Sequence, residues 1–257
     1  MALLQLRSVT ISFPRPGGWA AAVREVDLTL DAGRTLSLIG ASGSGKTLTA
    51  LAIGRLLPDG ARLEGKISFA GQDLADGKAL RRLRGAQIAY VFQEPMACLN
   101  PRLRAGDQIG ECLRLHRPEL SRGEIRDRVL HWLERLHLPD PRRVLHSYPH
   151  MLSGGMLQRV MIAMALCTGP RLLIADEPTS ALDGRAQRLL LDLLMELQGQ
   201  LSFSLLFISH NLRIAKLFNQ SVAVMDGGRI VEVGPVAEVF ARPARAQTAQ
   251  LLACSLP

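Results

Sequence analysis

The glycine-rich segment at residues 40–47 carries the clearest chemical signal in this sequence. It reads Gly-Ala-Ser-Gly-Ser-Gly-Lys-Thr and directly follows an apolar run at residues 35–39. Its glycines let the backbone turn N–H groups inward with no Cβ in the way, and such groups can hold a phosphate. The pattern G-x-x-x-x-G-K-[ST] between a strand and a helix is typical of nucleotide-binding sites. We expect the nucleotide to be bound by Gly40, Ser42, Gly43, Ser44, Gly45, Lys46 and Thr47.

Two side chains of this loop have distinct chemistry. The Lys46 ammonium can reach the β- and γ-phosphates, and the Thr47 hydroxyl can ligate Mg²⁺. The positive end of the helix that follows also favours an anion. The alternative is a chance glycine-rich turn, which the order of strand, loop and helix disfavours.

A second candidate is the pair of carboxylates that ends the apolar run at residues 172–175. Ligands of parallel sheets bind at the carboxyl ends of the strands, where Asp176 and Glu177 would lie. Asp176 can hold Mg²⁺, and Glu177 can act as the general base that activates a water. The alternative is a helix cap after a strand, because Asp is common at that position.

The third candidate is the segment Ser153-Gly154-Gly155, which precedes a helical pattern. Ser153 can cap the helix, and the two glycines leave its N-terminus open to an anion. It is either an ordinary capped helix or a second phosphate site. One chain cannot easily direct two helix N-termini at one γ-phosphate, whereas two copies facing each other can.

The elements that must position these residues follow from hydrophobic periodicity. The first segment alternates apolar and polar residues and predicts β-strands broken by turns at residues 14–18 and 31–33. Residues 102–150 show helical spacing at Ile109, Cys112 and Leu113 and again at Ile125, Val129, Leu130, Leu133 and Leu136. The later alternation of strands and helices predicts a mostly parallel sheet. The other expected strands are 66–70, 87–92, 171–175, 203–208, 221–225 and 229–232, and the other expected helices are 46–57, 156–167, 184–198 and 211–217.

Composition narrows the class of protein. A chain of 257 residues suffices for one large domain or for a domain with a subdomain. The net charge of +8 is compatible with nucleic acid, a membrane surface or an acidic ligand, but a solvated arginine-rich surface is the simpler interpretation. The start lacks the pattern of a signal peptide, and no stretch approaches the about 18 apolar residues of a membrane span. The scattered cysteines, without a C-x-x-C, favour a reducing compartment over a disulfide framework or a zinc site: Cys98, Cys112, Cys167 and Cys254.

Taken together and in this order, the motifs resemble those of the ATP-binding-cassette (ABC) ATPases over nearly the whole chain. Residues 40–47 match the Walker A loop, 152–158 the signature loop and 174–177 the end of Walker B. Gln93 matches the Q-loop glutamine, which senses Mg²⁺ and the attacking water. The resemblance implies catalytic roles for Glu177, His210 and Gln93, Mg²⁺ ligation by Thr47, Gln93 and Asp176, and nucleotide contacts from Ser153, Gly154, Gly155, Gln158 and Asp183.

Within this family the chain is most similar to the ATPase subunits of peptide and nickel importers. The stretches at residues 95–101 and 148–156 resemble theirs, and Leu157 before Gln-Arg resembles the nickel branch. The tail departs from the pattern at residues 245–247, and with only Cys254 in the tail no iron–sulfur cluster is expected. Phe13 matches the usual adenine-stacking position; Trp19 is its rival, and Phe13 could equally be a core strand residue.

The resemblance implies an α/β fold: a P-loop NTPase core with a mostly parallel sheet, an N-terminal antiparallel β subdomain and an inserted α-helical subdomain. The expected single domain divides into a core at 1–92 and 168–257 and a helical subdomain at about 93–167. ATP and Mg²⁺ are the expected cofactors. The expected partners are a second ABC ATPase subunit, membrane permeases and, indirectly, a substrate-binding protein, at the cytoplasmic face of the membrane and without nucleic acid.

The implied activity is ATP hydrolysis that energises an importer for nickel, metal chelates or short peptides. A non-transport scaffold ATPase, as in phosphonate breakdown, is the alternative. A small-molecule kinase is disfavoured, because a kinase has no need for Gln93 or for the segment at 153–155.

Overall fold

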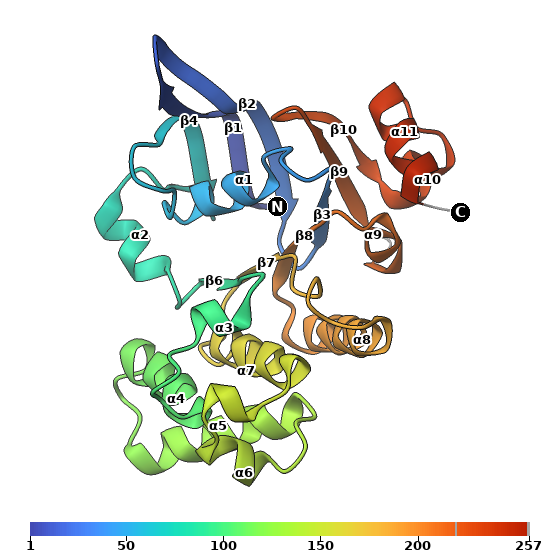
Figure 1. Ribbon diagram of the computed structural model, residues 1–257. Helices are drawn as coiled ribbons and strands as arrows, with labels where there is room; N and C mark the ends of the chain where they lie inside the picture. Colours follow the sequence, from blue (N-terminus) through green and yellow to red (C-terminus); the bar gives the residue numbers. More distant parts are fainter. Residues whose placement is uncertain (219, 256–257) are drawn as a thin grey trace. The chain divides into compact units, whose positions relative to one another are not determined.

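A computed structural model of the chain describes residues 1–218 and 220–255 (Figure 1). The chain divides into two compact units. The first comprises Met1–Arg82 and Ser204–Pro257, and the second comprises Leu83–Phe203. The second unit is wider than the helical segment expected at 93–167, because strands and a long helix on either side belong to it.

An antiparallel sheet in the order β2-β1-β4-β5 opens the first unit and confirms the expected N-terminal strands. Its long hairpin turns at Pro16 and Gly17, where Gly17 has a φ of 88°. The side chains of Leu4, Leu6 and Ile11 are buried on one face of the sheet. The strands are β1 (Ala2–Arg15), β2 (Gly18–Asp31), β4 (Arg62–Phe69) and β5 (Gln72–Asp73).

The mainly parallel sheet expected from the sequence is also present in the first unit. There β3 pairs in parallel with β8 and β9, and β9 continues into β10 through an antiparallel hairpin. Every residue of β3 and β8 is buried, as in a sheet covered on both faces. The strands are β3 (Thr35–Ile39), β8 (Ser204–Ser209), β9 (Ser221–Asp226) and β10 (Arg229–Pro235).

Helices pack against this sheet and complete the first unit. A cluster of buried residues that includes Leu212, Val222, Val236 and Leu252 joins the later helices to the strands. The last two helices were not predicted, because their segments are short and lack a long periodic pattern. The helices are α1 (Lys46–Ile53), α2 (Gly77–Leu83, which ends at the start of the second unit), α9 (Leu212–Phe218), α10 (Val236–Ala241) and α11 (Ala246–Ser255).

The second unit contains two parallel strands and most of the helices. Strand β6 (Ile88–Val91) pairs with β7 (Leu172–Asp176). The helices follow one another along the chain, and in Figure 1 α4 to α7 gather into one bundle. They are α3 (Pro95–Cys98), α4 (Ala105–His116), α5 (Arg122–Arg135), α6 (Pro141–His146), the 3₁₀ turn η1 (Pro149–Met151), α7 (Gly154–Leu166) and α8 (Gly184–Leu201).

The helical spacing predicted at residues 102–150 is confirmed by α4 and α5. Helix α5 begins with a capping box, in which Ser121 and Glu124 exchange side-chain and backbone hydrogen bonds. Its predicted apolar face is buried at Ile125, Val129 and Leu133. Such a face can be predicted because residues three and four apart share one side of a helix.

The predicted end of the helix after the phosphate loop is wrong. The sequence suggested residues 46–57, but α1 ends at Ile53. Gly54 caps it, and Arg55 has a φ of 51° in the left-handed region, which no helix continues through. The apolar Leu56 misled the prediction because its helical spacing persists after the backbone has turned.

Candidate nucleotide site

The phosphate loop leaves β3 as predicted and turns through glycines, two of which have a positive φ. Gly45 is the N-cap of α1 with a φ of 106°, and Gly43 has a φ of 78°. A Cβ on Gly40 would lie 2.1 Å from the Met225 carbonyl oxygen. The glycines are therefore required by backbone conformation and by close packing.

Lys46 lies inside this loop and is only 5% exposed. Its ammonium group donates to the carbonyl oxygens of Gly40 at 3.0 Å and Ala41 at 2.8 Å, and to Ser44 Oγ at 3.4 Å. The loop thus holds a positive charge beside inward-turned N–H groups, which suits a polyphosphate. Ser42 and Thr47 are exposed, so their hydroxyls are accessible from solvent.

The turn between β9 and β10 forms a hydrogen bond to the phosphate loop. The Gly228 N–H donates to the Ser44 carbonyl at 3.1 Å, and the Gly228 carbonyl accepts from the Arg24 N–H at 2.7 Å. A Cβ on Gly228 would meet the Ala22 carbonyl oxygen at 2.5 Å. This contact could not be predicted from the sequence, because its partners lie far apart along the chain.

His210 leaves the same edge of the same sheet as the phosphate loop. Strands β3 and β8 run in parallel with Ile39 opposite Ser209, so Gly40 and His210 are each the first residue beyond the edge. His210 is exposed. The adjacent Ser209 hydroxyl accepts from the Asn211 N–H at 3.0 Å and fixes the turn. The first unit therefore brings together two of the predicted motifs.

The second unit brings Gln93, Asp176 and Glu177 to one sheet edge. Val91 of β6 lies opposite Ala175 of β7, and the predicted residues follow directly. Asp176 ends the buried strand and is 6% exposed, whereas Gln93 is exposed in the loop after β6. Carboxylate and amide oxygens at such an edge are the kind of ligand that Mg²⁺ takes.

Glu177 has an unusual backbone conformation, with a φ of 44°. A residue with a Cβ in the left-handed region costs about 1–2 kcal/mol. The turn is fixed by Ser180, whose N–H and hydroxyl both donate to the Glu177 carbonyl, at 3.2 and 3.1 Å. Strain of this kind concentrates at functional sites, so the backbone of Glu177 is consistent with a functional role.

The segment at 153–155 begins α7, as expected. Ser153 is the N-cap, and its hydroxyl accepts from the Met156 N–H at 3.4 Å. Ser153 and Gly154 are exposed, and no atom lies within 4 Å of a Cβ placed on Gly154. Gln158, in contrast, is 2% exposed, so it lies within the unit rather than at the open helix start.

Asp183 is the N-cap of α8, and its carboxylate accepts from the Ala186 N–H at 2.8 Å. It is exposed, so capping leaves it accessible. Thr179, which was not predicted, is buried and accepts from Gln187 Nε2 at 2.9 Å. This bond ties the loop after Glu177 to α8.

The two candidates for adenine stacking lie on the β1–β2 hairpin. Phe13 is half-buried and faces Ala20 on the neighbouring strand. Trp19 is 55% exposed, and the Arg62 guanidinium lies 6.0 Å from the centre of its ring. Both remain predictions.

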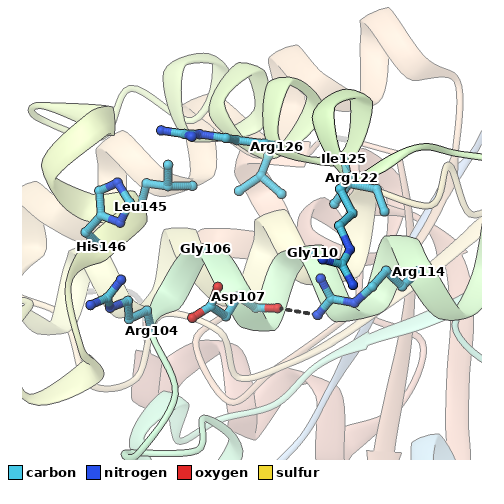
Figure 2. Close-up of a pocket in the computed structure, with 11 residues that line it drawn as sticks. Arg104, Gly106, Asp107, Gly110, Arg114, Arg122, Ile125, Arg126, Leu145 and His146 are labelled. Atoms are coloured by element: carbon cyan, nitrogen blue, oxygen red, sulfur yellow. Dashed lines mark hydrogen bonds between the residues drawn. The ribbon is translucent and has the colours of Figure 1, made fainter.

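A pocket of about 470 Å³ lies among α4, α5 and α6 of the second unit. Figure 2 shows Arg114 and Arg122 gathered at one end, with Arg104 and His146 at the other. Arg126 lines it as well, and Asp107 is its one carboxylate. This pocket could not be predicted from the sequence because its arginines come from separate helices; the spacing of Arg122 and Arg126 by four was the available signal.

The chain matches the family model described as ABC transporter over residues 23–180. It is 47% identical, over 97% of its length and 76% of the relative's, to a Brucella ovis protein provisionally named a peptide import ATP-binding protein. It is also 47% identical to the uncharacterized ABC transporter ATP-binding protein YejF of Escherichia coli K12; the match covers 97% of this chain and 48% of YejF.

Two solved structures share the fold. One is the dimeric post-hydrolysis state of the ATP-binding cassette MJ0796 bound to ADP and Pi, with a TM-score of 0.81, 28% identity and coverage of 91% of this chain and 99% of that one. The other is cbiO1 of Clostridium perfringens, part of the ABC transporter complex cbiONQ, with a TM-score of 0.77, 26% identity and coverage of 100% and 96%.

Proposed function

This chain belongs to the ABC transporter family of ATP-binding proteins, and from that premise we propose that it is the ATP-hydrolysing subunit of a short-peptide importer. The observation that carries the proposal is the shared sheet edge of the phosphate loop and His210. Peptide import is in the name of the Brucella relative, whereas nickel is suggested by Leu157 alone.

The chemistry that we propose is phosphoryl transfer from ATP to water. Lys46 and the loop N–H groups hold the phosphates, and His210 contacts the γ-phosphate. Glu177 accepts a proton from the attacking water as the oxygen–phosphorus bond forms and ADP leaves. Buried Lys46 suits the first role, and the exposure of His210 is consistent with contact to a ligand.

The donor set fits a magnesium ion, because hydroxyl, amide and carboxylate oxygens are hard ligands. Thr47, Gln93 and Asp176 are the residues that would hold Mg²⁺. When bound, the ion would neutralise charge on the β- and γ-phosphates. The exposure of Thr47 and Gln93 is consistent with this role.

We further propose that two such subunits share each nucleotide. The exposed start of α7 at Ser153 and Gly154 offers N–H groups and a hydroxyl to a phosphate held by another copy. The similar cassette MJ0796 is dimeric in its solved structure. Closure around ATP and reopening after hydrolysis would supply the mechanical work.

The arginine-lined pocket among α4, α5 and α6 is the surface that we propose for the membrane partner. No helix of the described residues is long and apolar enough to cross a bilayer, so attachment to a membrane would need a partner protein. Four arginines against one aspartate favour an acidic segment of a permease loop on the cytoplasmic side.

Reconstitution tests the whole proposal. The subunit and its permeases, placed in lipid vesicles, should hydrolyse ATP faster when a binding protein loaded with dipeptide is added. Stimulation by nickel but not by dipeptide would reassign the cargo. ATPase activity without co-purification of any permease would favour a non-transport scaffold.

The docking surface has a sharper test. The double variant Arg122→Glu/Arg126→Glu should lose co-purification with the permeases but keep basal ATP hydrolysis, because both arginines are exposed and lie away from the motifs. Arg7→Glu is the control, since it reverses an exposed charge in the first unit. Equal loss in the control would rule out a specific surface.

A further inference from the structure

Two cysteines that are far apart in the sequence meet inside the second unit. Cys112 lies in α4, and Cys167 caps the C-terminal end of α7. The Cys167 thiol donates to the carbonyl oxygen of Met164 at 3.4 Å, and its interaction with the Cys112 thiol shifts the pKa of both groups. Cys167 Sγ also lies 4.0 Å from the carbonyl oxygen of Ile109, one helical turn before Cys112. The two sulfurs are therefore held beside each other by the packing of two helices.

Among the cysteines whose side chains the structure describes, none is in a disulfide bond. The pair is nevertheless unequal in reactivity. The interaction with Cys167 lowers the pKa of Cys112, although burial and the charge of Glu111 oppose it and Arg114 assists. The interaction with Cys112, together with burial, raises the pKa of Cys167. Cys112 is thus the sulfur that more readily becomes a thiolate, which is the reactive form.

Cys112 is the more accessible of the two cysteines to a small oxidant, because Cys167 is buried. The side chain of Cys112 is half-buried rather than enclosed. Cys167 lines a cavity of about 240 Å³ together with Arg117, Arg128 and Trp132.

We propose that Cys112 and Cys167 form a redox-sensitive pair, which hydrogen peroxide converts into a disulfide that ties α4 to the end of α7. The Cys112 thiolate attacks one oxygen of hydrogen peroxide. The O–O bond breaks, hydroxide departs, and Cys112 becomes a sulfenic acid. The Cys167 sulfur then attacks the Cys112 sulfur. The S–O bond breaks, and the departing hydroxide takes the Cys167 proton as water. Two thiols are oxidised, and one peroxide is reduced to two waters.

The disulfide would connect two functional surfaces, a consequence that rests on the proposed function. Helix α4 lines the arginine pocket proposed for the permease, and α7 begins at Ser153. Closing the sulfurs to about 2.05 Å would draw the two helices together and fix their relative position. The tied helices could no longer shift against each other when the permease moves, so any step that needs that shift would be blocked.

A variant with only the two cysteines in question tests the bond itself. In Cys98→Ser/Cys254→Ser, peroxide should remove two hydrogen atoms from the intact mass and give one cross-linked peptide pair, both reversed by dithiothreitol. Adding Cys112→Ala to this background should abolish both changes. Free thiols after peroxide, or sulfinic acid on Cys112 without a cross-link, would overturn the proposal.

The consequence for turnover is measured in the vesicles with permeases. Peroxide should lower the stimulation of ATP hydrolysis by about fivefold or more, reversibly, and Cys167→Ala should be resistant. Unchanged stimulation in protein with a proven cross-link would overturn the clamping role. Reduced protein that hydrolyses no ATP would instead refute the proposed function and leave the disulfide, read by mass, as a separate result.

Discussion

Ile39 and Ser209 lie opposite each other on neighbouring parallel strands, so Gly40 and His210 begin their loops at the same level of one sheet edge. This register explains how residues from distant parts of the chain can act on one phosphate. It depends on buried β3 and β8, whose apolar residues fix the pairing. A one-residue slip would exchange the faces on which these side chains pack and disrupt the close packing on both sides, so the register is strongly specified.

Lys46→Ala should reduce ATP affinity and turnover, the latter by ~10²-fold or more, because the buried charge that we propose to hold the phosphates is lost. Nucleotide-binding titrations and steady-state hydrolysis measure the two effects. Lys66→Ala is the control, since Lys66 is an exposed lysine paired with Asp73 at 3.6 Å in the same unit. A similar loss in both variants would point to general destabilisation.

Glu177→Gln should leave ATP binding intact and slow hydrolysis by ~10²-fold or more, as expected for loss of a general base. Glu177→Gly should be equally slow but at least as stable to thermal unfolding, since the left-handed backbone there suits glycine. Full activity in Glu177→Gln would remove this residue from the role. Unfolding of the glycine variant would show that the side chain is structural.

Ser153→Arg should block hydrolysis while the isolated subunit still binds ATP, because Ser153 is proposed to complete the site of the partner copy. Its matched control is Ser121→Arg, which removes another exposed helix cap of the same unit at a similar cost of about 1 kcal/mol. The readouts are hydrolysis and nucleotide binding at equal protein concentration. Normal hydrolysis in Ser153→Arg would contradict a shared site.

Acidification should destabilise the second unit through His116. Burial lowers the pKa of this histidine from its ordinary value of 6.5, and its ring packs against Gly85. Between the lowered pKa of the folded protein and the ordinary value of 6.5, the unfolded chain binds more protons than the folded protein does. Stability therefore falls as the pH drops through and below 6.5. Urea unfolding at several pH values should show a smaller decline in His116→Gln. Identical pH profiles would exclude this histidine as the cause.

Local patterns could be predicted from the sequence because their causes are local. The phosphate loop, the cap at Ser153 and the apolar face of α5 each depend on residues within a few positions of one another. The left-handed Glu177 could not be predicted, because the glycine that usually marks such a conformation is not there. The true end of α1 was missed because Arg55, an ordinary helix former, reverses the backbone.

Contacts between segments that lie far apart in the sequence could not be predicted. The arginines of the pocket come from separate helices, and the Cys112–Cys167 pair depends on how α4 packs on α7. Periodicity assigns a residue to a face of its helix but does not say which other helix covers it. Those contacts become visible only in three dimensions.

The hydrogen bond between the Gly228 N–H and the Ser44 carbonyl has a consequence for protein engineering. Exchanging the C-terminal segment for that of a homologue also replaces the residues that pack against the phosphate loop. These residues are Met225 and Gly228. A chimera joined after residue 228 keeps the native contacts to the phosphate loop, whereas a chimera joined before residue 225 takes these contacts from the homologue. Grafts of the second kind should need compensating changes near Ala22 before they recover nucleotide affinity.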